Sequence, residues 1–119
     1  MTTNTTPHDI GLAELPATIR AFLAAHSARE ADAAVRTFTH DAVVVDQGET
    51  FRGTEQLLDF LQNAGSQFTY TTELIAARRD DDAHWSVVNR IEGDFPGSVA
   101  DLDYRFTLTG DLISGLTIS

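Results

Sequence analysis

The sequence contains no cysteine and no lysine, and it has one tryptophan and three prolines in 119 residues. Without cysteine the chain can form no disulfide framework, so a reducing cytoplasm is the simplest expected location. Eight arginines stand against 18 acidic residues, which gives a formal net charge of −10. Because this charge repels phosphate backbones and anionic lipid surfaces, neither nucleic acid nor a membrane is an expected partner.

Long apolar runs are also missing. Apolar runs such as Ala42–Val45 are far shorter than the roughly 20 residues that cross a bilayer. The start of the chain, MTTNTTPHD, has neither the basic nor the apolar region of a secretion signal. Residues 1–8 are polar and lack periodicity, which predicts a disordered tail, and residues 9–119 have the length of a single domain.

Helical periodicity dominates the first half of the chain. Apolar residues recur at helical spacing over residues 16–27, which predicts a first helix. Ser27 and Glu30 have the spacing of a capping box, which predicts a second helix that ends near His40. The β-branched run before Gln47-Gly48 predicts a short strand in a hairpin, and a third helix is expected from Gly53 until Gly65 stops it.

The second half changes to an alternating pattern with period 2, which is typical of strands. Four such segments are joined by short loops, and these strands contain Phe68–Leu74, Trp85–Ile91, Leu102–Leu108 and Leu116–Ile118. Short connections require an antiparallel meander. The predicted fold class is therefore α+β, with the helices packed on one face of a mostly antiparallel sheet.

Six short motifs, in this order along the chain, resemble the nuclear transport factor 2-like superfamily and its SnoaL-like branch. They are Phe38-x-x-Asp41-Ala42-Val43-Val44-x-Asp46, Phe51-Arg52-Gly53, Phe68-x-Tyr70, Gly93-x-Phe95-Pro96-Gly97-Ser98, Tyr104-x-Phe106-x-Leu108 and Leu116-x-Ile118. The resemblance implies that three N-terminal helices and a curved sheet form a cone around an apolar pocket. It also implies a dimer, because members of the superfamily are frequently dimeric. The superfamily includes polyketide cyclases, ketosteroid isomerases, an epoxide hydrolase and proteins without known activity, so the fold alone does not settle the function.

The resemblance places the proton-shuttling carboxylate of the isomerases at Asp46. A carboxylate in an apolar pocket suits this chemistry because desolvation raises its proton affinity. The alternative is that Asp46 stabilises the turn at Gln47-Gly48 through backbone hydrogen bonds. The tyrosine donor of the similar isomerases falls at Phe22, so Tyr104 and Asn89 are the candidate replacements for it. Asn89 is expected across from Tyr104 if Ile91 pairs with Leu102 through the turn that follows it. These two side chains could instead be ordinary packing residues.

Further candidates are assigned to substrate binding. His26 lies on the apolar stripe of the first helix, where it is either a core histidine or a base in the pocket. Aromatic residues complete the set: Phe22, Phe51, Trp85 and Phe106. The four histidines lack metal-ligand spacing, and the chain has no phosphate-binding loop and no nucleophile elbow, so neither a metal nor another cofactor is expected.

These observations predict a protein that binds an apolar small molecule and acts as a cofactor-independent isomerase or cyclase by abstracting a proton next to a carbonyl. The alternative is a non-catalytic ligand-binding or dimerisation module of the same fold, which the missing tyrosine favours. A homodimer is expected through the outer face of the sheet, because Ile75 and Val88 have the parity opposite to the pocket-facing residues and need cover.

Overall fold

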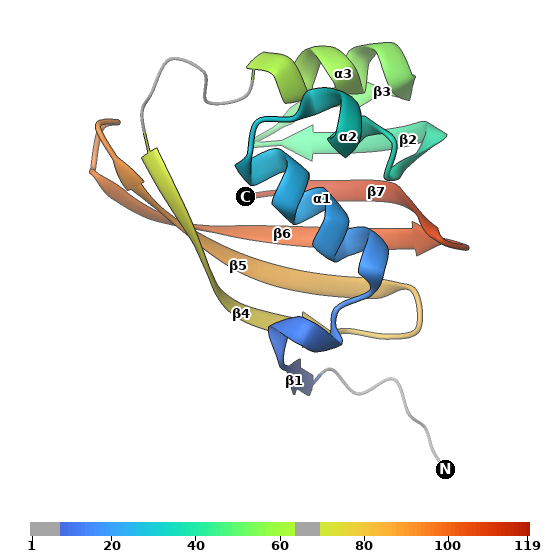
Figure 1. The fold of residues 1–119 in the computed structure, drawn as a ribbon, viewed down its shortest axis with the longest axis horizontal. Helices are drawn as coiled ribbons and strands as arrows, with labels where there is room; N and C mark the ends of the chain where they lie inside the picture. Colours follow the sequence, from blue (N-terminus) through green and yellow to red (C-terminus); the bar gives the residue numbers. More distant parts are fainter. Residues whose placement is uncertain (1–7, 64–69) are drawn as a thin grey trace.

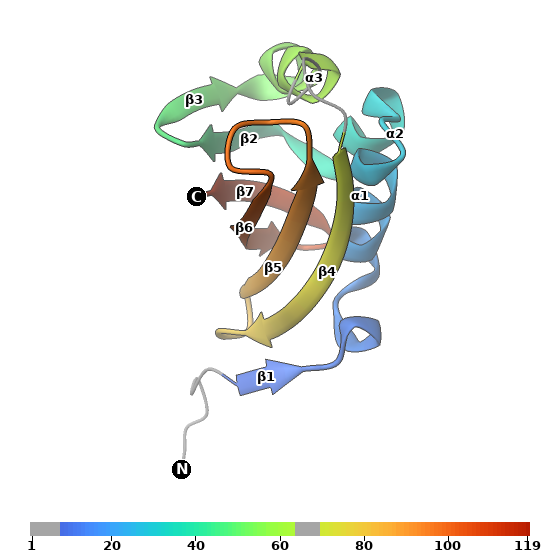
Figure 2. The same cartoon turned by 90° about the vertical axis from the view of Figure 1, so that its left-hand side faces the viewer.

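The computed structural model describes residues 8–63 and 70–119. In these residues seven strands form one curved sheet, and three helices lie on one of its faces (Figures 1 and 2). The helices are α1 (Ala17–Ser27), α2 (Ala31–Val35) and α3 (Gly53–Asn63), and a 3-10 turn, η1 (Leu12–Glu14), precedes α1. The strands are β1 (His8–Ile10), β2 (Phe38–Asp46), β3 (Glu49–Arg52), β4 (Tyr70–Arg79), β5 (His84–Gly93), β6 (Val99–Thr109) and β7 (Leu112–Ile118).

The strand order is β1-β4-β5-β6-β7-β2-β3. All neighbours are antiparallel except β2 and β7, which run parallel. The α+β class and the meander of the four long strands are as the sequence predicts. The helices are not all N-terminal, because α3 follows the β2–β3 hairpin. α1 runs diagonally across the sheet, while α3 lies beside β2 and β3 (Figure 1).

The predicted second helix is much too long. α2 ends at Val35, and Phe38 already belongs to β2, where it pairs with Ile113 of β7. Ser27 makes no cap, because it is the last residue of α1 and its hydroxyl bonds Thr72 of β4 instead. Pairing with a distant strand has overridden the local helical periodicity. The predicted helix stop at Gly65 and the strand start at Phe68 lie outside the described residues.

The N-terminal boundary also differs from the prediction. Residue 8, which was expected to belong to a disordered tail, is the first residue of β1. This strand adds to the edge of the sheet by pairing with the end of β4, where His8 is opposite Arg79. Residues 1–7 of the predicted tail lie outside the described residues.

A β-bulge divides β4. Leu74 pairs with Asn89 and Ala76 with Val88, so Ile75 is an extra residue in its strand. An extra residue reverses the alternation of side chains and bends the strand. Accordingly Leu74 faces the helices before the bulge, whereas beyond it the buried residue is Ala77.

The register of β5 and β6 differs by two residues from the sequence prediction. Ile91 was expected opposite Leu102, but Asn89 takes that place and Ile91 pairs with Ala100. The connecting loop sets this register through Gly97 and Ser98, which both have positive φ (96° and 66°). Because the shift is even, the residues keep their faces, and Asn89 and Tyr104 remain on the same side of the sheet.

The core lies between α1, α3 and the middle of the sheet. Its largest fully buried side chains are Phe22, Phe106, Ile19, Leu57, Ile113, Leu116, Val44 and Val87. Phe22 of α1 meets Phe38 and Phe106 edge to face, with ring centroids 5.3 and 5.7 Å apart. This aromatic cluster holds α1 on the sheet.

Candidate functional site

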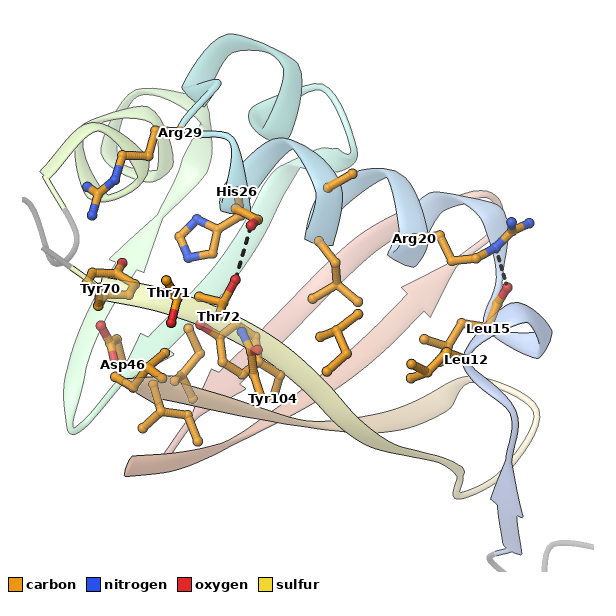
Figure 3. Close-up of a pocket in the computed structure, with 18 of the residues that line it drawn as sticks. Leu12, Leu15, Arg20, His26, Arg29, Asp46, Tyr70, Thr71, Thr72 and Tyr104 are labelled. Carbon is orange, nitrogen blue, oxygen red and sulfur yellow. Dashed lines mark hydrogen bonds between the residues drawn. The ribbon is translucent and has the colours of Figure 1, made fainter. Parts of the chain in front are cut away.

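A cavity of about 920 Å³ lies between α1 and the sheet. Its walls come from η1, α1, α3 and five strands, so no single element forms it. Figure 3 shows Asp46, Tyr70 and Arg29 toward one end. Leu12, Leu15 and Arg20 line the other end (Figure 3). The cavity is thus polar at one end and mainly apolar at the other, which is the usual composition of a small-molecule site.

Asp46 is the last residue of β2 and lies next to a tight turn. Gln47 and Gly48 both have positive φ (50° and 89°), as a two-residue hairpin turn requires. The Asp46 carboxylate is half-buried and lines the cavity. Burial raises its pKa above the ordinary value, and the nearby charge of Glu49 adds to this effect. A carboxylate with raised proton affinity suits proton abstraction.

Tyr104 and Asn89 line the same cavity from β6 and β5. They are 4% and 5% exposed. Burial raises the pKa of the Tyr104 hydroxyl to about 12, a hydrogen bond with the Asn89 side chain opposes this shift, and the charge of Asp46 contributes to it. Tyr104 therefore keeps its proton at neutral pH. The Asn89 carbonyl oxygen is buried and has no hydrogen-bond partner among the described residues.

His26 lies in the last turn of α1 and also lines the cavity. Its ring stacks on Phe22 with centroids 5.3 Å apart, and it lies 6.4 Å from the Tyr104 ring. Burial lowers the pKa of His26, and the positive charge of Arg29 lowers it further. His26 is consequently a neutral imidazole at neutral pH, able to accept or donate one hydrogen bond.

The other predicted binding residues lie elsewhere. Phe22 and Phe106 are in the core with 0% and 1% exposure, and neither lines the cavity. Phe51 packs against Phe60 of α3, with ring centroids 4.9 Å apart, so Phe60 rather than Phe51 forms that wall. Trp85 packs against the edge of the core beyond the cavity. Periodicity gives the face of each aromatic residue, but its depth depends on how closely α1 and α3 approach the sheet.

Arg29 was not predicted as a site residue, and no sequence signal marks it. It has a positive φ of 60° just after α1, a position where glycine is usual. Its guanidinium lies over the Tyr70 ring, 5.1 Å from the centroid, and both residues line the cavity. Within the described part of the chain, Arg29 forms no ion pair. The polar end thus also holds a cation.

The arrangement allows acid–base chemistry on a bound carbonyl compound. Asp46 can accept a proton, while Tyr104 can donate a hydrogen bond to the oxygen that becomes negative. Within residues 8–63 and 70–119, no three side chains of the metal-ligating types gather to hold an ion. None of the helices in the same ranges is long and apolar enough to cross a membrane.

The raised pKa of Asp46 has a consequence for stability. A carboxyl whose folded pKa exceeds its unfolded value stabilises the fold below the unfolded pKa, and that contribution is lost as the pH rises through the folded pKa. We therefore expect Asp46→Asn to raise the melting temperature by a few degrees at about pH 7 and not at about pH 3.5, where the unfolded carboxyl is largely protonated. Thermal denaturation of both proteins at the two pH values measures this difference. A gain that does not change with pH would contradict it.

Comparison with known proteins finds a matching family and several solved structures of similar fold. A family model described as a SnoaL-like domain matches residues 19–114. A candidate polyketide cyclase from Sinorhizobium meliloti has a similar structure, with a TM-score of 0.84, 30% identity, and coverage of 92% of this chain and 100% of that chain. No curated protein matches the sequence.

Two further solved structures share the fold at lower identity. A protein from Sphaerobacter thermophilus has a TM-score of 0.75 and 22% identity, covering 86% of this chain and 91% of that chain. A protein from Catenulispora acidiphila with a ketosteroid isomerase-like fold, in complex with trimethylamine, has a TM-score of 0.76 and 19% identity, covering 87% of this chain and 85% of that chain.

Proposed function

The chain belongs to the SnoaL-like domain family, and from its cavity we propose that it binds a largely apolar small molecule and abstracts a proton next to a carbonyl group of that molecule. The observation that carries this proposal is that Asp46 and Tyr104 line the same cavity. Asp46 offers a base whose pKa is raised, and Tyr104 offers a hydroxyl that keeps its proton and can donate a hydrogen bond. The product would be an isomer or a cyclised form of the substrate, and the reaction requires no cofactor.

The apolar end of the cavity supports a substrate with a hydrocarbon body. Leu12 and Leu15 line that region, while Asp46 lies toward the polar end (Figure 3). Burial of apolar area drives binding and the polar groups orient the molecule. A volume of about 920 Å³ is large enough for a ligand with several rings.

Hydrogen exchange tests the proposed function without knowledge of the natural product. We expect the wild-type protein to accelerate loss of the proton signals next to the carbonyl of 2-tetralone in D2O, measured by NMR. Heat-denatured protein at the same concentration is the control. The alternative, a module that binds ligands without chemistry, predicts binding of such ketones in calorimetry with exchange at the buffer rate. Phe22 in place of the isomerase tyrosine favours that alternative.

The proposal includes a homodimer formed through the face of the sheet opposite to the helices. Ile75 is 39% exposed in the β4 bulge, and its neighbour across the strands, Val88, points away from the cavity side of Asn89. We expect light scattering to give about twice the monomer mass of 13.0 kDa, and Ile75→Glu to shift the equilibrium toward monomer. A wild-type mass equal to that of one chain at micromolar concentration would contradict the dimer.

A further inference from the structure

Asn89 is the most unusual polar residue of the cavity. It lies in the middle of β5, and the residues paired with it on β4 and β6 are Leu74 and Leu102. Its carbonyl oxygen Oδ1 is buried and has no hydrogen-bond partner within residues 8–63 and 70–119, although the residue lines the cavity. Folded proteins satisfy nearly all of their buried polar atoms. Thr39 carries the other such atom in the described part of the chain, but it does not line the cavity.

Tyr104 carries the complementary group. It lines the same cavity, and because burial raises the pKa of its hydroxyl to about 12, the phenol keeps its proton at neutral pH. The Tyr104 hydrogen is not used by Asn89 Oδ1, since that atom has no hydrogen-bond partner among the described residues. The pair thus presents a donor, the Tyr104 O–H, beside an acceptor, the Asn89 Oδ1, that no described residue uses.

We infer that the ligand presents a matching pair to these residues: a carbonyl oxygen that accepts from Tyr104, and a neighbouring O–H or N–H group that donates to Asn89 Oδ1. This inference rests on the proposed site and names the substrate class, a neutral hydroxy-carbonyl compound or a primary amide. A simple ketone would leave Asn89 unpaired. An ionised carboxylate offers two acceptors and no donor for Asn89 Oδ1.

Two probes of similar size test whether a donor group on the ligand, next to its carbonyl, strengthens binding. 1-Naphthamide has a carbonyl with adjacent N–H groups, whereas methyl 1-naphthoate has the carbonyl without a donor. Calorimetry should show that the wild-type protein binds the amide about tenfold or more tightly than the ester, because only the amide satisfies the buried acceptor. Equal affinities, a preference for the ester, or no binding of either probe would overturn the inference.

The variant Asn89→Leu removes the acceptor with little change in volume. We expect it to lose the preference for the amide and to bind the ester within about threefold of the wild-type affinity. Its melting temperature should be equal to or above that of the wild type, because a buried unpaired polar atom is replaced by an apolar group. A clearly lower melting temperature, or a retained preference for the amide, would show that Asn89 is satisfied within the fold and would overturn the inference.

Tyr104→Phe is the matched control. It removes the donor that both probes share, so both affinities should fall by a similar factor while the ratio between them changes less. A fall in the amide affinity alone would overturn the assignment of the donor to Tyr104. None of these measurements requires turnover. A protein that prefers the amide but does not exchange protons would retain this inference and lose the catalytic proposal.

Discussion

Replacing Asp46 by asparagine is expected to slow proton exchange at the carbon next to the carbonyl of 2-tetralone by about 100-fold or more, because the amide keeps the shape of the side chain but cannot accept the proton. The binding affinity for the ketone should change much less, since the carboxylate is not part of the apolar wall. NMR exchange rates at saturating protein, together with calorimetric affinities, separate these two quantities.

Asp41 offers a matched control for this variant. It lies on the same strand, is exposed and does not line the cavity, so Asp41→Asn should exchange at the wild-type rate. An unchanged exchange rate in Asp46→Asn would show that Asp46 is not the base. His26 is then the next candidate, because it is neutral at neutral pH and lines the same cavity. His26→Gln would test that transfer of role.

Replacing Phe22 by alanine is expected to cost about 3–5 kcal/mol of folding stability, the usual range for truncating a buried phenylalanine. The ring is fully buried and contacts three other rings, those of His26, Phe38 and Phe106. Its loss leaves a void between α1 and the sheet. Urea denaturation should give this difference, and the melting temperature should fall by at least about 10 °C.

Two other substitutions calibrate this result. Phe22→Leu fills part of the void and should cost less than half as much as alanine. Val99→Ala, at a side chain that is 49% exposed, should change stability by no more than about 0.5 kcal/mol. If Phe22→Ala cost no more than Val99→Ala, the aromatic cluster would not be what holds α1 on the sheet.

The elements that follow from local chemistry could be predicted from the sequence. α1, α3 and the β2–β3 hairpin depend on apolar periodicity and on the Gln47-Gly48 turn, all of which are contained within short segments. The prediction of the second helix was wrong at Phe38, because the conformation of this residue depends on pairing with Ile113, far along the chain. β1 was missed for the same reason, since His8–Ile10 is a strand only through its pairing with β4.

In the candidate site, too, some residues could be predicted from local pattern and others depend on tertiary packing. Strand alternation keeps Asn89 and Tyr104 on one face for any register shift by an even number of residues, so the two-residue error in the predicted register did not separate them. The depth of Phe22 does depend on tertiary packing, and the structure places it behind His26 rather than in the cavity. Arg29 could not be found at all, because nothing in its sequence neighbourhood indicates a left-handed backbone in a residue other than glycine.

The bulge at Ile75 gives β4 two halves that can change independently. Before it, Tyr70, Thr72 and Leu74 face the cavity, so substitutions at the two polar positions, Tyr70 and Thr72, alter which molecule fits without touching the core. Beyond it, the strand buries Ala77 and carries β1 along its edge, so substitutions there act on the fold. A new ligand preference could therefore evolve in the first half of the strand while the second half keeps the sheet intact.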